Sequence, residues 1–110
     1  MTLSEMAKAL QLQTIFDDYK DVTIQTAYTG DLLSDVMGNA DEECVFITIQ
    51  AHKNSIAVAT LKDSPAIILC NDRLPAEDMI QSAKDEGIAL FTTAENQFTV
   101  SGKLYALLKS

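Results

Sequence analysis

The sequence is poor in the residues that build disulfide scaffolds and metal centres. It contains two cysteines and one histidine among 110 residues. A zinc site needs about three or four His or Cys ligands, so we expect no metal. Cys44 and Cys70 each lie inside an apolar run, which predicts small buried hydrophobic residues in a reducing compartment rather than a disulfide.

Basic residues and long apolar runs are also scarce. Eight Lys and Arg stand against sixteen Asp and Glu, a formal net charge of −8. An acidic domain is a poor electrostatic partner for phosphate backbones and anionic lipid. No apolar run approaches the roughly 20 residues of a membrane span, and the N-terminus lacks the basic and then apolar layout of a signal peptide. We therefore expect a cytoplasmic protein, a single domain over residues 1–110, that binds neither nucleic acid nor membranes.

The common catalytic motifs are missing as well. The sequence has no G-x-G-x-x-G, no phosphate-binding G-x-x-x-x-G-K-S/T, no C-x-x-C, no H-E-x-x-H and no G-x-S-x-G. Both cysteines occupy expected buried strands, where a thiol stays protonated and inert. We expect no catalytic residues and no cofactor, and interpret the protein as a non-enzyme.

The N-terminal part predicts one short helix and two strands. Thr2–Glu5 reads as a capping box, in which Thr2 and Glu5 each satisfy an amide of the first turn. The apolar residues that follow have the spacing of one buried helix face: Leu3, Met6, Ala7 and Leu10. Residues 12–16 and 22–28 predict strands, joined by a polar link that fits a hairpin or a pair of edge strands.

From residue 44 onward, apolar strands alternate with helices. Near-continuous apolar runs over 44–49, 66–70 and 88–91 are typical of parallel strands covered on both faces. Helices are expected over 54–63, 75–86 and 95–108, the second with Pro75 in its first turn and Gly87 after its end, the third opening with a capping box at Thr92–Glu95. The predicted fold class is α/β: a single small layered domain with a mainly parallel sheet, a short N-terminal helix and edge strands.

Polar residues follow each of these apolar strands. In open parallel sheets, ligands bind beyond the carboxyl ends of the strands, near helix N-termini with free amides. The predicted ligand-binding residues are His52, Lys53, Asn54, Asn71, Asp72, Arg73 and Thr93. Three of them can meet an anion. The alternative for each residue alone is structural: Asn54 caps a helix, Asn71 and Asp72 form a turn, and Lys53 and Arg73 are merely solvated.

The segment between Lys20 and Lys53 carries negative charge only. Its carboxylates are Asp21, Asp31, Asp35, Asp41, Glu42 and Glu43. Asp31 and Asp35 are four residues apart in a short helix expected over 31–37, and such a pair can hold a divalent cation with Ser34. A structural alternative makes Asp31 an N-cap or first-turn carboxylate. An acidic patch facing a basic partner protein is favoured over a metal.

The same short helix is unusually apolar. It offers Leu32, Leu33, Val36 and Met37 within seven residues. Core packing is one interpretation. The other is a self-complementary subunit interface, which would make the protein a homodimer.

Several segments resemble the DRTGG domain family. These are Gly30–Met37, the strand and helix over 47–61, the strand over 66–69 and the pieces from Pro75 to Thr93. The resemblance spans nearly the whole chain and implies a fold similar to the N-terminal domain of HPr kinase. Family members occur alone or attached to CBS-domain pyrophosphatases and phosphotransacetylases. Stand-alone members similar to this chain are associated with iron-hydrogenase gene clusters of anaerobic bacteria. The resemblance implies a regulatory or assembly module without a catalytic centre.

The chain departs from the family at its name-giving residues. This chain has Ala51–Asn54 where the family has its Asp-Arg pair, and Leu69–Asp72 where the family has its Thr-Gly-Gly. His52 and Lys53 can keep a weaker anion site in place of the Arg. The leading hypothesis is a non-catalytic regulatory or assembly module, homodimeric, that senses a small anionic ligand such as a nucleotide. An alternative is a protein-interaction adaptor of a hydrogenase or other redox-enzyme system, without a ligand. A phosphotransfer accessory, by analogy with HPr kinase, is disfavoured because no phosphate loop is present.

Overall fold

The centre of the molecule is a five-stranded sheet in the order β1-β5-β4-β3-β2. The computed structural model describes residues 1–109. Its strands are β1 (Gln13–Thr14), β2 (Ala27–Thr29), β3 (Val45–Thr48), β4 (Ala66–Leu69) and β5 (Ala89–Thr92). β2 to β5 are parallel, and β1 joins antiparallel to β5 at one edge. The predicted α/β class with a mainly parallel sheet is confirmed.

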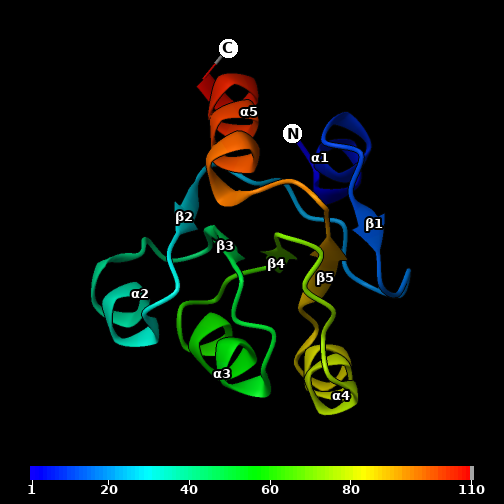
Figure 1. Ribbon diagram of the computed structural model, residues 1–110, viewed down its shortest axis with the longest axis vertical. Coiled ribbons are helices and arrows are strands. Elements are labelled where there is room, and N and C mark those ends of the chain that lie inside the picture. Colours follow the sequence, from blue (N-terminus) through cyan, green and yellow to red (C-terminus); the bar gives the residue numbers. More distant parts are fainter. Residues whose placement is uncertain (110) are drawn as a thin grey trace.

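Helices cover both faces of this sheet, which gives three layers (Figure 1). One face carries α1 (Leu3–Ala9) and α5 (Gln97–Lys109). The other carries α2 (Leu33–Asn39), α3 (Lys53–Leu61) and α4 (Glu77–Glu86). No helix within residues 1–109 has the length and apolar character needed to cross a membrane.

The apolar strands contribute side chains to two hydrophobic cores, one on each face of the sheet. Successive strand side chains point to opposite faces, so each strand feeds both layers. Ile47, Ile68 and Phe91 pack toward α1 and α5, whereas Phe46, Ile67 and Leu90 pack toward α2, α3 and α4. All six are at most 1% exposed. Burial on both faces explains why these strands are continuously apolar rather than alternating.

Two of the predicted helix boundaries are confirmed in detail. The Thr2 hydroxyl accepts from the Glu5 amide at 3.2 Å and the Glu5 carboxylate accepts from the Thr2 amide at 2.8 Å, so the capping box of α1 is present. Gly87 ends α4 at φ +70°, a left-handed conformation that glycine adopts without a steric penalty. Pro75, however, lies before the helix, because Ala76 is the N-cap and α4 begins at Glu77.

The prediction for residues 22–28 is wrong over most of its length. Only Ala27–Thr29 form a strand, and β1 and β2 lie at opposite edges of the sheet, so they form no hairpin. The reason is competition from the N-terminus. The Leu3 amide donates to the Val22 carbonyl at 3.0 Å, and the Ile24 amide donates to the Met1 carbonyl at 2.9 Å. The backbone polar groups of this stretch therefore find hydrogen-bond partners at the N-terminus and not in the sheet.

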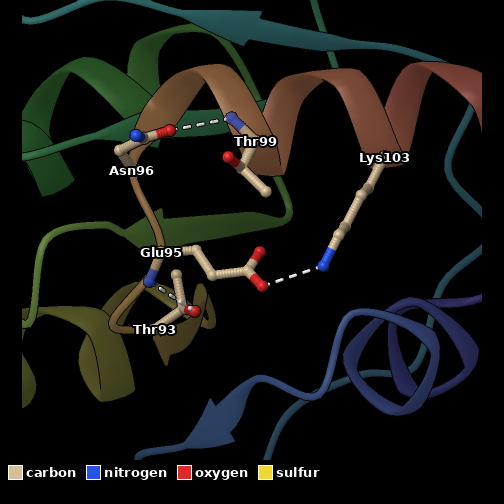
Figure 2. Close-up of polar contacts among 5 residues, drawn as sticks. All are labelled: Thr93, Glu95, Asn96, Thr99 and Lys103. Carbon is tan, nitrogen blue, oxygen red and sulfur yellow. Dashed lines mark hydrogen bonds and ion pairs between the residues drawn. The ribbon is translucent and has the colours of Figure 1, made fainter.

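The predicted start of the last helix is also wrong. Thr92 is a buried residue at the end of β5 and makes no cap. Instead the Asn96 carboxamide oxygen accepts from the Thr99 amide at 2.9 Å, and α5 begins at Gln97 (Figure 2). The Thr93 hydroxyl accepts from the Glu95 amide at 3.2 Å and shapes the loop before the helix. Asn96 is the better cap because it directly precedes the helical residues.

Candidate functional site

The candidate site is the edge of the sheet at which β2, β3, β4 and β5 end. Loops 30–32, 49–52, 70–76 and 93–96 lie there and lead into α2, α3, α4 and α5. We call these four loops, with the first residues of the helices that follow, the strand-end rim. Ligands of open α/β sheets bind at this kind of edge because helix N-termini face it.

A rigid turn after β4 holds one part of the rim. Asn71 and Asp72 both have left-handed backbone conformations, with φ of +60° and +56°, which Asn and Asp tolerate better than most residues. Their amides donate to the carbonyls of Glu95 and Thr93 at 3.0 and 2.9 Å, which ties the loop after β4 to the loop after β5. The predicted turn is therefore confirmed, and it fixes the backbone immediately before Arg73.

The start of α3 forms a second part of the rim. His52 is the N-cap, and its imidazole makes no capping hydrogen bond. Lys53 and Asn54 are the first two helical residues, so the interpretation of Asn54 as the cap is wrong. The first amides of a helix have no partner within the helix, and here no side chain supplies one. This N-terminus is open to an acceptor group.

Two cations of the rim are unpaired. Lys53 and Arg73 are exposed, and neither forms a salt bridge with a carboxylate of residues 1–109. Over residues 1–109 a single salt bridge occurs, between Lys103 Nζ and Glu95 Oε1 at 2.8 Å (Figure 2). The positive charges of Lys53 and Arg73 therefore stay free within a chain whose formal net charge is −8.

The structure does not gather all the predicted ligand-binding residues into one cavity. Lys53 and Asn54 line a groove of about 420 Å³ between α3 and α4. Asp72 and Thr93 line a separate hollow of about 350 Å³ beside residues 11 and 13 of the N-terminal segment. His52 and Arg73 line neither of these two hollows. The predicted residues therefore divide between two hollows, of which the first extends along α3 and α4 away from the rim.

Asp31 organises the rim in a way that the sequence did not reveal. Its Oδ1 atom accepts from Thr48 Oγ1 at 2.9 Å, from the Ile49 amide at 2.9 Å and from Gln97 Nε2 at 3.0 Å. Its backbone carbonyl accepts from Gln50 Nε2 at 2.8 Å. One residue thereby joins the loop after β2, the end of β3 and the first turn of α5. The only sequence signal was Thr48, a polar residue at the end of an apolar run.

Asp31 and Asp35 do not form the predicted pair. α2 begins at Leu33 with Leu32 as its N-cap, so Asp31 lies before the helix and is neither cap nor first-turn residue. Asp35 accepts from Tyr28 Oη at 2.6 Å and from Asn39 Nδ2 at 2.8 Å. The hydrogen bond to Asp35 also raises the pKa of Tyr28. In the part of the chain that the structure describes, no three His, Cys, Asp or Glu side chains are grouped to hold a metal ion.

The two thiols are buried, as expected. Cys70 lies directly after β4, and burial raises the pKa of its thiol to about 11, with the carboxylates of Asp31 and Glu95 adding to the effect. Burial also raises the pKa of Cys44. A thiol held protonated at neutral pH is a poor nucleophile and a poor metal ligand.

The four predicted interface residues do not share one apolar face. Val36 is 2% exposed and belongs to the core, and Leu33 packs partly buried against the same cluster. Leu32 is 68% exposed and Met37 is 37% exposed. Leu32 does not follow the helical spacing of the buried residues, because it precedes the first helical residue of α2.

Comparison with known proteins finds similarity among solved structures. Neither protein-family models nor curated proteins match the chain. Among solved structures, the chain is similar to the CBS and DRTGG domains of the regulatory region of a Clostridium perfringens pyrophosphatase, complexed with the activator diadenosine tetraphosphate. The TM-score is 0.69 and the sequence identity 16%, over 94% of this chain and 45% of that one. The likeness supports a DRTGG-like fold. At this identity it concerns the fold alone.

Proposed function

We propose that the chain is a non-catalytic regulatory module that binds a small anionic ligand, such as a nucleotide, at the strand-end rim. One observation carries this proposal. Two unpaired cations, Lys53 and Arg73, and an uncapped helix N-terminus at His52 occur on the same edge of a strongly acidic chain. Backbone amides, the helix dipole and adjacent positive charge together favour a phosphate group.

The structural neighbour supports the choice of a nucleotide. Its regulatory region is complexed with a dinucleotide activator that carries four phosphates. The expected contacts in this chain are His52, Asn54, Asn71 and Arg73, which stay predictions. The fixed turn at Asn71 supports such a role, because a pre-ordered loop loses little conformational entropy on binding.

A non-catalytic role agrees with the chemistry of the thiols. Both are buried and protonated at neutral pH, so neither supplies a nucleophile. We expect no ATP or pyrophosphate hydrolysis above the buffer rate. Hydrolysis that survives purification and disappears in His52→Ala would contradict this part of the proposal.

Thermal-shift measurements with a panel of mono- and dinucleotides test ligand binding. A nucleotide that binds only the folded state raises the melting temperature, and at about 100 times its dissociation constant it adds about 2.7 kcal/mol of stability. Arg73→Ala and Lys53→Ala should reduce the shift. Lys20→Ala is the control, since it removes an exposed cation from a loop far from the rim in sequence. No shift with any nucleotide at millimolar concentration would reject the proposal.

The second candidate is a protein-interaction adaptor of a hydrogenase or other redox-enzyme system. Exposed apolar side chains around the rim favour it, among them Leu74 and Phe98, which are 76% and 87% exposed. The same nucleotide panel separates the two candidates, because an adaptor without a ligand shows no thermal shift.

We also propose that the module is a homodimer through α2. Leu32 and Met37 are the exposed apolar residues that a two-fold contact would cover. Light scattering at about 100 µM should show a dimer, because the expected dissociation constant is about 1 µM. Leu32→Asp should give a folded monomer. This variant is preferable to one at Leu33, whose partial burial in the core would confuse loss of the dimer with loss of the fold. A native monomer at that concentration would reject the dimer.

A further inference from the structure

β2 leaves one side of its backbone unpaired. It is the last strand in the sheet order, and β3 is its neighbour on one side only. The Thr26 carbonyl accepts from Val45 at 3.0 Å and the Gly30 amide donates to Ile47 at 3.1 Å. Because alternate residues of a strand bond to the same neighbour, Ala27 and Thr29 direct their N–H and C=O groups away from β3. No sixth strand among residues 1–109 pairs with them.

Apart from its short length of three residues, this edge lacks the features by which proteins usually protect a free strand. Residues 22–29 contain no lysine, no other charged residue and no proline. Natural edge strands commonly carry such residues, because they prevent another strand from pairing. An unprotected edge is a site at which an extended segment can add with main-chain hydrogen bonds.

A groove runs beside the edge, between β2 and α5. Its volume is about 300 Å³, and Ala27, Thr29, Tyr105 and Leu108 are among its lining residues. A hydrogen bond of 2.6 Å between the hydroxyls of Thr29 and Ser101 connects β2 to α5. Tyr105 is 66% exposed although it lines the groove, so its ring offers apolar area to an occupant. The groove can take the side chains that an added strand would direct toward α5.

The charge around the edge indicates what kind of segment it takes. Two carboxylates lie beside β2, Asp31 shortly after its end and Asp35, which accepts a hydrogen bond from Tyr28 of the strand at 2.6 Å. Asp31 lies two residues after the end of β2, and its Oδ2 atom has no partner among residues 1–109, since all three donors contact Oδ1. At the far end of the groove Lys109 lies 5.8 Å from the centre of the Tyr105 ring. A second copy would bring the same carboxylates against each other, whereas a basic segment would neutralise them.

We propose that the free edge of β2 and the adjacent side of α5 bind an extended, basic segment of a partner protein as a sixth strand. Main-chain bonds to Ala27 and Thr29 hold it, alternate apolar side chains enter the groove against Tyr105, and a Lys or Arg at one end meets Asp31. The groove against α5 is separate from the start of α3, and the two surfaces share only the rim residue Asp31, so failure of one proposal leaves the other standing.

Two synthetic nine-residue peptides test the surface. Both alternate Thr and Val, and one has Arg at each end where the other has Glu. Amide hydrogen exchange of the full chain, measured by NMR, reports on β2 directly. The Arg peptide should slow exchange at Ala27 and Thr29 by about tenfold or more, because their outward amides become hydrogen-bonded. The amide of Tyr28 already faces β3 and should change little. No slowing at Ala27 and Thr29, or an equal effect of the Glu peptide, would overturn the proposal.

Matched variants locate the contact on α5. Tyr105→Ser should weaken binding of the Arg peptide about tenfold, as loss of a central aromatic contact does. Leu61→Ser removes an apolar side chain that is equally exposed, 66%, on α3, and should change the affinity less than about twofold. Equal effects of the two variants would overturn the proposal. Nucleotide-induced thermal shifts should be the same in Tyr105→Ser and in the native chain.

Ala27→Pro tests whether a second copy occupies the edge instead. Proline removes the outward amide, and an edge strand tolerates proline where the N–H faces solvent. The variant should lose peptide binding and keep the oligomeric state of the native chain. If Ala27→Pro turns a native dimer into a folded monomer, a second copy covers the edge, and the proposal is overturned.

Discussion

Asp31 is the residue on which most of the rim depends. It accepts hydrogen bonds from partners that are 17, 18 and 66 residues away in the chain. These donors come from the end of β3 and the first turn of α5. The carboxylate therefore holds these two elements together through hydrogen bonds to the loop after β2. A carboxylate with three donors is a structural requirement as much as a functional candidate.

Asp31→Ala should therefore lower the free energy of unfolding by about 2–4 kcal/mol, because the Thr48 hydroxyl and the Ile49 amide lose an acceptor in a partly buried site. Urea denaturation measures the change. Asp31→Asn keeps an acceptor oxygen and should cost less. Asp41→Ala, at an exposed carboxylate, should stay within about 0.5 kcal/mol of the native chain. Equal losses for Asp31→Ala and Asp41→Ala would contradict the role given to Asp31.

Cys70 gives the protein a specific dependence on alkaline pH. Burial raises the pKa of its thiol from 9.0 to about 11, so the unfolded chain loses this proton at a lower pH than the folded chain. The stability that protonated Cys70 contributes is complete below pH 9 and is lost as the pH rises through 11. The free energy of unfolding should fall over this range, and more steeply in the native chain than in Cys70→Ala. Identical slopes in urea denaturation series would show that Cys70 does not contribute.

At the scale of elements, the start of α5 depends on a single cap. The Asn96 side chain accepts from the Thr99 amide, and the salt bridge between Glu95 and Lys103 links the loop before α5 to a residue further along the helix (Figure 2). Asn96→Ala should cost about 1 kcal/mol, and Asn96→Asp should restore it. Lys103→Ala should cost less, since exposed ion pairs contribute about 0–1 kcal/mol. Thermal unfolding ranks the variants. A greater loss for Lys103→Ala would reverse this assignment.

The elements also show which parts of the fold the sequence could predict. β3, β4 and β5 were predictable because both of their faces are buried, and continuous apolar character is a local signal. Val22 and Ile24 looked like the same kind of strand, but their backbone partners are at the N-terminus, which no local pattern indicates. The rim was predictable because strand ends gather at one edge of a parallel sheet. Its central carboxylate was not, because the partners of Asp31 are distant in the chain.

For the whole molecule, the uneven charge sets a dependence on salt. Sixteen acidic and eight basic residues leave a net charge of −8, and only one salt bridge occurs across residues 1–109. Repulsion among the carboxylates opposes the folded state at low ionic strength and is screened as salt rises. The melting temperature should therefore rise between about 10 and 200 mM NaCl. Each 1 kcal/mol that screening adds to the free energy of unfolding should raise it by about 4–8 °C. A flat or falling melting temperature would show that the carboxylates are too far apart to repel one another.

The position of β1 has a consequence for the order of events during synthesis. Gln13 and Thr14 pair with Thr92 and Phe91 of β5, the last strand of the sheet to be synthesised. Gln13 and its partner Thr92 are 79 residues apart in the chain. At about 5–20 residues per second, the ribosome needs roughly 4–16 s to supply that strand. Until then the apolar side chains of α1 have no complete core to enter, since Phe91 belongs to the same cluster. The newly made N-terminal segment is therefore exposed to chaperones for seconds, and its folding is postponed until the C-terminal third of the chain has emerged.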